Sequence, residues 1–434
     1  MKLYSTNNPF VHVSFQEAVF NSMPQDKGLY MPENIPHLPD AFFEQLAHYT
    51  LPQIAFEVAK HLLGDTIPEH DLKALIEDAI NFDAPVVELE KDVYVLELFH
   101  GPSLAFKDFG ARFMSRIMSY FLREGEKQLD VLVATSGDTG GAVALGFLGV
   151  PNTRVTILYP KGKVSEIQEL QLTTNGQNIR AVTVDGTFDD CQALVKQAFV
   201  DDELNAEFRL TSANSINIAR LIPQTFYYFN AYAQLLRAGK TQVAFCVPSG
   251  NFGNIGAGLL AWKMGLPVAQ FVAATNANDT VPAFLKTGIY EPKASVQTIA
   301  NAMDVGNPSN WVRIAHLFKD DAAGLTNLLT GYTYTDEQTR DAIQQVFDQY
   351  NYVVCPHTAI AWRALKEWQQ EHANVTGVFL ATAHPCKFPD VFPEEIAKSI
   401  VVPEQVKELE TKEKQAVSLG KDFEGFKNYL LNNK

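Results

Sequence analysis

Cysteine is scarce in this sequence, and the few cysteines lie far apart. Only four occur in 434 residues, at Cys191, Cys246, Cys355 and Cys386, and no two of them form a CxxC pair. A fold held by disulfides or by structural zinc needs more thiols at closer spacing. We therefore expect four reduced, buried thiols, as in a cytoplasmic protein.

Long apolar runs and an excess of positive charge are also missing. No window approaches 18 consecutive apolar residues, so the sequence predicts no membrane-spanning helix and no membrane partner. The first residues lack the apolar segment of a signal peptide. A net charge of −15 argues against a nucleic-acid partner, because proteins that bind phosphate backbones concentrate Lys and Arg. A small anionic substrate stays compatible with this charge, since a few local donors can hold it.

The composition that remains, 46% hydrophobic and 20% charged, is that of an ordinary globular protein. The length predicts two or three domains. We expect an accessory module at 1–80 and a main region at 81–434, with a smaller lobe at about 112–208. The residues after Pro389 are charged and predict a helical surface tail.

Short apolar strands alternate with helical segments from about residue 81 onward. This alternation indicates an α/β fold whose open, mainly parallel sheet is covered by helices on both faces. The predicted strands are 93–98, 131–135, 154–159, 179–184, 243–247, 268–275 and 377–382.

The segment HGPSLAFKDFG at 100–110 places a lysine, Lys107, among apolar residues. Gly101 and Pro102 end the preceding strand, because proline fixes φ and donates no backbone hydrogen bond. A poorly solvated ammonium has a lowered pKa, so the amine becomes a usable nucleophile, as in lysines that form Schiff bases. The alternative is that Lys107 extends to solvent from the start of an amphipathic helix.

Loops at the carboxyl ends of strands are where open α/β sheets bind ligands. The loop TSGDTGG at 135–141 has glycines that let the backbone approach a ligand and amides at a helix N-terminus, which suits a carboxylate or phosphate. A simple helix cap is the alternative. The candidate residues are Thr135, Ser136, Gly137, Asp138 and Thr139.

A second loop, PSGNFGNIG at 248–256, has three glycines at three-residue spacing with polar residues between them. Such a loop forms a nest of backbone N–H groups that binds phosphate without a metal, and no Walker sequence is present. A glycine-rich entry into a helix is the alternative. The candidate residues are Ser249, Gly250, Asn251, Phe252, Gly253 and Asn254.

A third loop, ATAHPCK at 381–387, follows the last predicted strand. The Thr382 hydroxyl could meet a heterocyclic nitrogen and Lys387 an anion of the substrate, although a simple turn is the alternative. His384 and Cys386 have no second pair of ligands at zinc spacing, so we expect no metal.

Three polar residues in SANSINIAR at 212–220 recur every third position: Asn214, Asn217 and Arg220. This spacing places them on one side of a helix start, and the Arg220 guanidinium offers two parallel donors to a phosphate. The alternative is a surface arginine beside capping residues.

Together these segments closely resemble those of the threonine synthases, pyridoxal-phosphate (PLP) enzymes of the tryptophan-synthase β fold type. The resemblance runs almost end to end. It implies two open, mainly parallel sheets flanked by helices, the fold of type II PLP enzymes, plus a small, mostly helical N-terminal module. It also implies that Lys107 forms the Schiff base with PLP, that 249–254 bind its phosphate and that Thr382 faces its ring nitrogen.

The same resemblance implies that 135–139 hold the substrate carboxylate and that Asn214 and Arg220 contact the substrate phosphate. The segments VSFQEAV at 13–19 and GLY at 28–30 resemble an N-terminal domain that sister enzymes lack, which favours threonine synthase over a dehydratase or a cysteine synthase.

The implied reaction converts O-phosphohomoserine and water into L-threonine and phosphate by γ-elimination and β-replacement, the last step of threonine biosynthesis. A phospholyase that uses the same cofactor stays open as an alternative. A dinucleotide-binding oxidoreductase is a weaker one, because the GxGxxA string at 256–261 lies inside a predicted helix rather than at a turn. The sequence leaves open whether the protein is a monomer or a homodimer.

Overall fold

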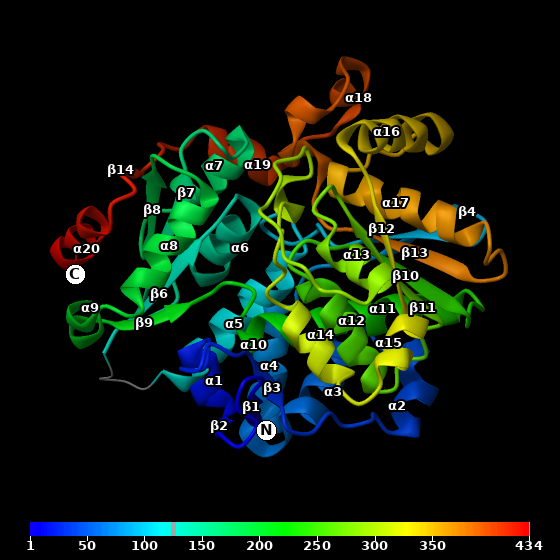
Figure 1. Cartoon of the computed structure of the whole chain (residues 1–434), viewed down its shortest axis with the longest axis horizontal. Helices are drawn as coiled ribbons and strands as arrows, with labels where there is room; N and C mark the ends of the chain where they lie inside the picture. Colours follow the sequence, from blue (N-terminus) through cyan, green and yellow to red (C-terminus); the bar gives the residue numbers. More distant parts are fainter. Residues whose placement is uncertain (123–126, 434) are drawn as a thin grey trace.

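The computed structural model describes residues 1–122 and 127–433. In this part of the chain, two α/β lobes stand side by side, and an N-terminal module lies beneath them (Figure 1).

The N-terminal module combines a small antiparallel sheet with short helices. The sheet has the order β2-β1-β3 and consists of β1 (Lys2–Ser5), β2 (His12–Ser14) and β3 (Tyr30–Pro32). The helices are α1 (Phe15–Asn21), α2 (Asp40–Gln45), α3 (Leu51–Leu63) and α4 (Glu69–Ala79), with 3-10 turns η1 (Leu46–His48) and η2 (Gly64–Thr66). The sequence predicted a mostly helical module, and the structure adds this sheet.

The large lobe is built on a six-stranded sheet of order β12-β11-β10-β13-β5-β4. Every neighbouring pair is parallel except β4 and β5 at one edge. The strands are β4 (Val86–Glu90), β5 (Val93–Glu97), β10 (Val243–Pro248), β11 (Gln270–Thr275), β12 (Leu329–Thr333) and β13 (Thr376–Ala381). Every residue of the central strands β10 and β13 is buried, as expected for parallel strands covered on both faces.

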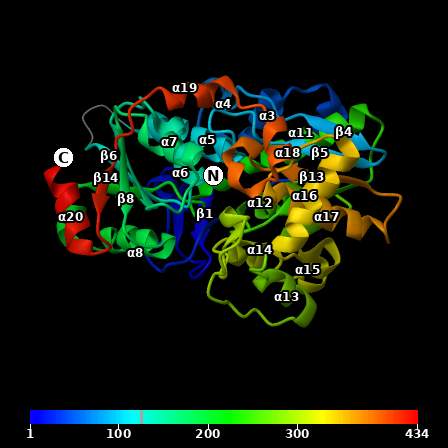
Figure 2. The ribbon, with the colours of Figure 1, turned by 90° about the horizontal axis from the view of Figure 1, so that it is seen from above.

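The small lobe is built on a five-stranded sheet of order β14-β8-β7-β6-β9, in which all neighbours are parallel. Its strands are β6 (Leu129–Ala134), β7 (Thr153–Pro160), β8 (Ile179–Val184), β9 (Arg209–Ser212) and β14 (Val417–Leu419). The end of the chain therefore returns to this lobe, and its last helix lies at the outer edge of the lobe (Figure 2).

Helices connect the strands of both sheets. In the first half of the main region they are α5 (Lys107–Phe121), α6 (Asp138–Phe147), α7 (Glu166–Thr173), α8 (Phe188–Ala198), α9 (Asp202–Glu207), α10 (Ile218–Leu221), α11 (Gln224–Arg237) and α12 (Gly253–Lys263). The later helices are α13 (Thr280–Thr287), α14 (Trp311–Leu317), α15 (Ala322–Leu328), α16 (Asp336–Tyr350), α17 (Pro356–Gln369), α18 (Glu394–Ser399), α19 (Glu404–Glu410) and α20 (Phe423–Asn432). The 3-10 turns are η3 (Asn301–Met303), η4 (Pro385–Lys387) and η5 (Pro389–Val391).

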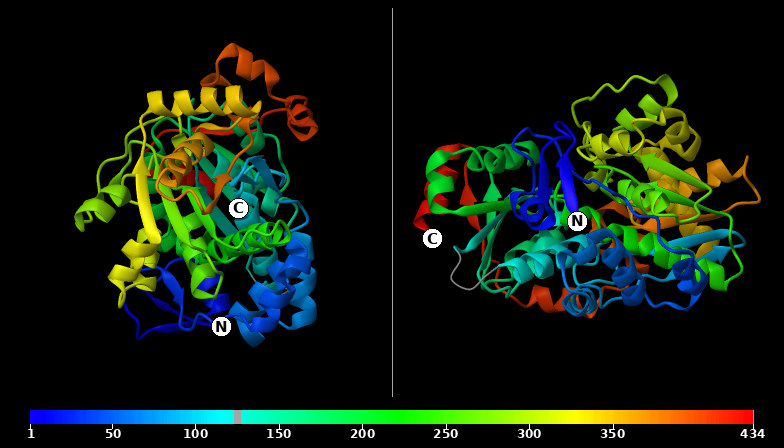
Figure 3. Two further views of the ribbon diagram at one scale, coloured as in Figure 1. Left: turned by 90° about the vertical axis from the view of Figure 1, so that its right-hand side faces the viewer. Right: turned by 90° about the horizontal axis from the view of Figure 1, so that it is seen from below.

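The N-terminal module contacts both lobes. Helix α3 packs on α11 of the large lobe, and α1 packs on β9 of the small lobe and on α5 and α10 between them. Seen from below, the module spans the junction (Figure 3). It therefore supports the edge where the two lobes meet.

The α/β fold with two mainly parallel sheets is confirmed, and the predicted strands correspond to β5, β6, β7, β8, β10, β11 and β13. The prediction of a surface tail after Pro389 is wrong in part. Strand β14 pairs with β8, and Phe426 of α20 is fully buried against the small lobe. A three-residue strand has no periodic pattern, so only pairing with a distant strand reveals it. Among the described residues, no helix is long and apolar enough to cross a bilayer.

Candidate active site

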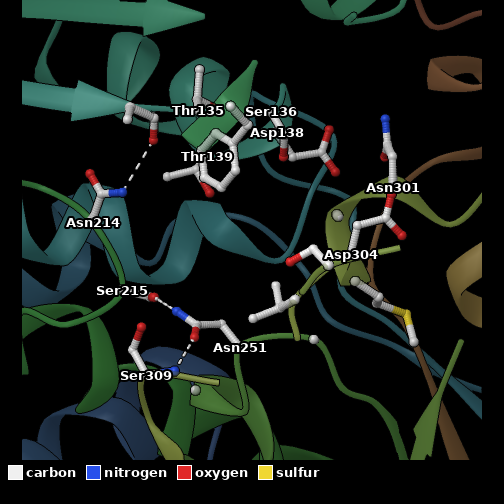
Figure 4. Close-up of a pocket in the computed structure, with 18 of the residues that line it drawn as sticks. Thr135, Ser136, Asp138, Thr139, Asn214, Ser215, Asn251, Asn301, Asp304 and Ser309 are labelled. Atoms are coloured by element: carbon white, nitrogen blue, oxygen red, sulfur yellow. Dashed lines mark hydrogen bonds between the residues drawn. The ribbon is translucent and has the colours of Figure 1, made fainter. Parts of the chain in front are cut away.

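A cavity of about 700 Å³ lies between the two lobes, at the carboxyl ends of β6, β10 and β13. Every site residue predicted from the sequence lines it except Gly137, Ser249 and Lys387. Thr135, Ser136, Asp138 and Thr139 of the small lobe lie on one side of the cavity, across from Asn301 and Asp304 of the large lobe (Figure 4).

Lys107 is the first residue of α5, and the loop before it is fixed to the end of β13. The Phe106 amide donates to the Thr382 carbonyl at 2.9 Å, and Ala105 forms an isolated bridge with Ala383. Lys107 and Thr382 are thereby held side by side at the cavity wall. Within the described residues, Lys107 Nζ forms no hydrogen bond or ion pair; it lies 6.0 Å from the centroid of the Phe106 ring.

Burial lowers the pKa of the Lys107 ammonium to about 8. The field of Asp138 opposes this shift, and the fields of Arg220 and Lys387 add to it. About a tenth of the amine is therefore neutral at pH 7, far more than for an ordinary lysine, and the neutral form is the one that a nucleophile or a proton acceptor requires.

The turn from β10 to α12 forms the expected cradle of amides. Phe252 adopts the left-handed conformation at φ 58°, directly before the first residue of α12. The main-chain N–H groups of 251–254 donate to no acceptor within the described part of the chain. Amides left free at a helix start, next to a left-handed residue, form a concave anion site. Gly250 is required beside it, since a Cβ there would lie 2.7 Å from Met303 Cα.

The polar side chains of this turn form hydrogen bonds within the protein and are not free to bind a ligand. Asn254 Nδ2 donates to the Pro248 carbonyl at 2.8 Å, and Asn251 Oδ1 accepts from the Ser309 amide at 2.6 Å (Figure 4). The cradle therefore offers backbone donors. The Ser249 hydroxyl donates to the Val247 carbonyl and does not face the cavity.

The loop at 135–141 is folded around the Thr135 hydroxyl. Thr135 Oγ1 accepts from the amides of Gly137 and Gly140 at 2.9 and 2.8 Å. The amides of Ser136, Asp138 and Thr139 have no acceptor among the described residues and lie at the start of α6. These free amides, rather than the Thr135 hydroxyl, are the donors available to a carboxylate. Gly137 has φ 136° and lies behind the cavity wall against Gln168.

Lys387 does not line the cavity, contrary to the prediction that it meets a substrate anion. Its Nζ lies 2.8 Å from Asp138 Oδ1 and donates to the Ser103 carbonyl at 2.9 Å, and the side chain is fully buried. Burial alone would raise the pKa of Asp138, but Lys387 and Lys107 hold it below its ordinary value. The charge of Lys387 is thus already matched inside the protein.

Arg220 is a buried cation without a carboxylate partner in the described part of the chain. One guanidinium nitrogen donates to the Ala213 carbonyl at 2.5 Å, while Nε has no acceptor. The group lies over Gly110 of α5, where a Cβ would come within 2.6 Å of Nε. Burial lowers the pKa of Arg220 to about 10, so it stays charged at neutral pH. Asn214 lines the same region and donates to the Ala134 carbonyl at 3.1 Å.

The cavity also has a wall that the sequence did not predict. Asn301, Asp304 and His357 line it, and the segment between α13 and η3 contributes Lys293, Ala294, Ser295 and Gln297. His357 Nε2 accepts from the Ala302 amide, and burial lowers the pKa of this imidazole to about 4. The only signal in the sequence was a lone histidine after a proline. These segments reach the site through tertiary packing and carry no glycine motif.

A lysine with a lowered pKa and a cradle of free amides, set at the carboxyl ends of parallel strands in a two-lobed α/β fold, define a PLP-dependent enzyme of fold type II. A family model described as pyridoxal-phosphate dependent enzyme matches residues 80–381. Models of the threonine synthase N terminus and C-terminal region match 2–80 and 358–430.

The chain is 44% identical to the threonine synthase of Haemophilus influenzae, over 99% of this chain and 100% of that protein. The crystal structure of threonine synthase from Escherichia coli has a TM-score of 0.92 at 43% identity and covers the whole of both chains. A PLP-bound threonine synthase from Brucella melitensis has a TM-score of 0.89 at 32% identity, over 100% of this chain and 99% of that one. The chain belongs to the threonine synthase family.

Its cofactor is PLP. The residues fit this group: Lys107 would supply the amine for an aldehyde, the free amides of 251–254 would supply donors for a phosphate, and Gly250 would leave room for it.

Proposed function

We propose that this chain converts O-phosphohomoserine and water into L-threonine and inorganic phosphate. The observation that carries the proposal is that, besides the amides at the start of α6, the cavity of Lys107 has two further anion sites. One is formed by the amides of 251–254 and the other by the Arg220 guanidinium. A cofactor phosphate occupies only one of them. The second, unpaired cation suits a substrate that brings a phosphate of its own.

The proposed assignment of the cofactor site follows the donors. The amides of 251–254 bind the cofactor phosphate, Lys107 binds the aldehyde, and Thr382 faces the ring nitrogen. A neutral hydroxyl at this nitrogen leaves it largely unprotonated. When bound, PLP supplies an electron sink next to the substrate α-carbon, and the protein positions the reacting atoms.

The substrate is held at both of its ends. The amides of Ser136, Asp138 and Thr139 bind the carboxylate at the start of α6, where the helix dipole favours an anion. Arg220 and Asn214, which also line the cavity, bind the phosphate. Fixing both ends places the carbon chain along Lys107.

Lys107 then moves the protons of the reaction. Once the substrate amine has displaced it, the Lys107 amine accepts the proton from Cα and serves the proton transfers at Cβ and Cγ. The Cγ–O bond breaks as phosphate leaves, and the oxygen of water forms a new bond to Cβ. In the net balance the proton lost from Cβ goes to Cγ, and the proton lost by water goes to the released phosphate. A lysine whose pKa is about 8 accepts and returns protons readily near neutral pH. Approach of the two lobes would keep bulk water from the intermediates.

The test is a product assay of the holoenzyme beside Lys107→Ala. We expect visible absorbance from bound PLP, threonine and phosphate in equal amounts, and loss of both absorbance and turnover in Lys107→Ala. Lys73→Ala, an exposed lysine on α4, is the control and should behave as wild type. Phosphate with a keto acid instead of threonine would make the protein a phospholyase, and a protein that PLP cannot colour would refute the proposal.

The division into 1–80 and 81–434, with a smaller lobe at about 112–208, is also kept as a proposal. The return of β14 and α20 to the small lobe would extend that lobe beyond these bounds. The cytoplasmic location and the choice between monomer and homodimer stay predictions. Light scattering of the purified protein decides the second.

A further inference from the structure

The ammonium groups of Lys387 and Lys107 both act on one carboxylate, that of Asp138, at the wall of the active site. Lys387 Nζ lies 2.8 Å from Asp138 Oδ1, and Asp138 is 5% exposed while Lys387 is 0% exposed. Lys107 lines the same cavity as Asp138 and has no partner for its ammonium among the described residues. The Asp138 carboxylate thus pairs with Lys387 and not with Lys107.

The surrounding hydrogen bonds stabilise the pairing of Asp138 with Lys387. Gln168 Nε2 also donates to Asp138 Oδ1, at 2.9 Å. The Ser103 carbonyl accepts from Lys387 Nζ at 2.9 Å and from Gln171 Nε2 at 3.0 Å. Lys387 therefore links the loop that precedes Lys107 with the start of α6, across the junction of the lobes.

We propose that Lys387 is a positioning residue that occupies Asp138 and so keeps this carboxylate from pairing with Lys107. The Lys107 amine then stays free to bind the cofactor aldehyde and to move protons. This inference rests on the proposed function, because it takes Lys107 as the cofactor-binding amine.

The effects of the surrounding charged and titratable groups on Lys107 are consistent with this role of Lys387. Asp138 of α6 favours the charged form of Lys107, whereas Arg220 of α10 and Lys387 of η4 disfavour it. His357 of α17 is held neutral at physiological pH, since burial lowers its pKa to about 4. Without Lys387, the Asp138 carboxylate would lose its ion-pair partner and would still favour the charged form of Lys107.

The experiment measures capture of PLP by the apoenzyme as a function of pH. Capture forms a C=N bond between Lys107 Nζ and the aldehyde carbon and releases one water, and it needs the neutral amine. The second-order rate constant, followed by visible absorbance, is compared for wild type, Lys387→Gln, Lys387→Arg and the double variant Lys387→Gln with Asp138→Asn. Glutamine keeps N–H donors for Asp138 and Ser103 but carries no charge.

For wild type we expect a midpoint near pH 8, the pKa of Lys107. Lys387→Gln should raise the midpoint by about one pH unit or more, because Asp138 then pairs with Lys107. Capture at pH 7 would then be about tenfold slower. Lys387→Arg, which keeps the charge, and the double variant, which removes both charges, should return the midpoint to that of wild type.

An unchanged midpoint in Lys387→Gln would overturn the inference. A shift in the double variant as large as that in Lys387→Gln would also overturn it, because the effect would then not depend on Asp138. If circular dichroism shows that the variants do not fold, the pH midpoint of the wild-type protein is the test. A wild-type midpoint at the ordinary lysine value of about 10.4 would mean that Asp138 already serves Lys107. Failure of the proposed function looks different: wild type would capture no more PLP than Lys107→Ala.

Discussion

Several charged side chains of the active site are withdrawn from solvent. Arg220, Asp138 and Lys387 are buried and Lys107 is half-buried at the cavity wall, and of these charges only the Asp138–Lys387 pair is internally neutralised. An enclosed cation without a counterion is costly unless a ligand supplies the opposite charge. Arg220 is therefore the residue whose loss should act most directly on substrate recognition.

Arg220→Ala should lower kcat/KM for O-phosphohomoserine by about 30-fold to several thousand-fold, since removing one partner of a desolvated charge pair costs about 2–5 kcal/mol. Arg220→Lys should restore little, because an ammonium lacks the two parallel donors of a guanidinium. Steady-state kinetics with PLP saturating checks this. The control is Arg340→Ala, an exposed arginine on α16 that donates to the Val391 carbonyl. Wild-type kinetics in Arg220→Ala would remove this residue from the site.

At the scale of elements, the decisive feature is the turn from β10 to α12. A fully buried strand leads into a left-handed Phe252, and the following helix presents its free amides to the cavity. The geometry depends on close packing of the turn against η3, where Met303 and Ala302 touch the space above Gly250.

Gly250→Ala should weaken PLP binding by about tenfold or more, because overpacking of this kind typically costs 1–3 kcal/mol and the backbone of η3 has to move. Gly256→Ala, one turn further along α12, is the matched control: its Cβ would find its nearest neighbour at 3.6 Å, an ordinary contact. Fluorescence titration of both apoenzymes with PLP measures the difference. Equal affinities would show that the phosphate does not sit against this turn.

At the scale of the whole molecule, the N-terminal module is tied to the active site through one buried asparagine. Asn217 Nδ2 donates to the Val19 carbonyl at 2.8 Å and to Ser22 Oγ at 2.9 Å, while its Oδ1 accepts from the Ala219 amide at the start of α10. Ser22 in turn donates to the Ser212 carbonyl at the end of β9. One side chain thus joins the module, the small lobe and the helix that carries Arg220.

Asn217→Ala should lower the free energy of unfolding by about 1–3 kcal/mol, because it removes a helix cap and leaves buried acceptors unpaired. It should also raise KM through displacement of Arg220. Urea titration together with steady-state kinetics checks both effects. Asn205→Ala, an exposed asparagine on α9, should change stability by less than about 0.5 kcal/mol. Wild-type stability and KM in Asn217→Ala would show that Asn217 does not couple the N-terminal module to the active site.

The sequence by itself determined the parts of this protein that depend on local pattern. Continuous apolar runs predicted seven strands of the two sheets, because strands covered on both faces need apolar side chains throughout. The shorter or more exposed strands β4, β9, β12 and β14 lack such runs and were not predicted. Glycine-rich loops after those strands predicted the anion sites, because close approach of a backbone to a ligand requires glycine. Lys107 was identified by its apolar neighbours.

Only the tertiary structure decided what depends on partners distant in sequence. It paired β14 with β8, turned Lys387 from the cavity towards Asp138, and brought Asp304 and His357 to the wall of the site. Whether a lysine is free or paired depends on which carboxylate the fold places next to it, and a local pattern carries no record of that neighbour. The sequence thus determined which chemistry is present, and the packing of the two lobes decided which charges remain free to perform it.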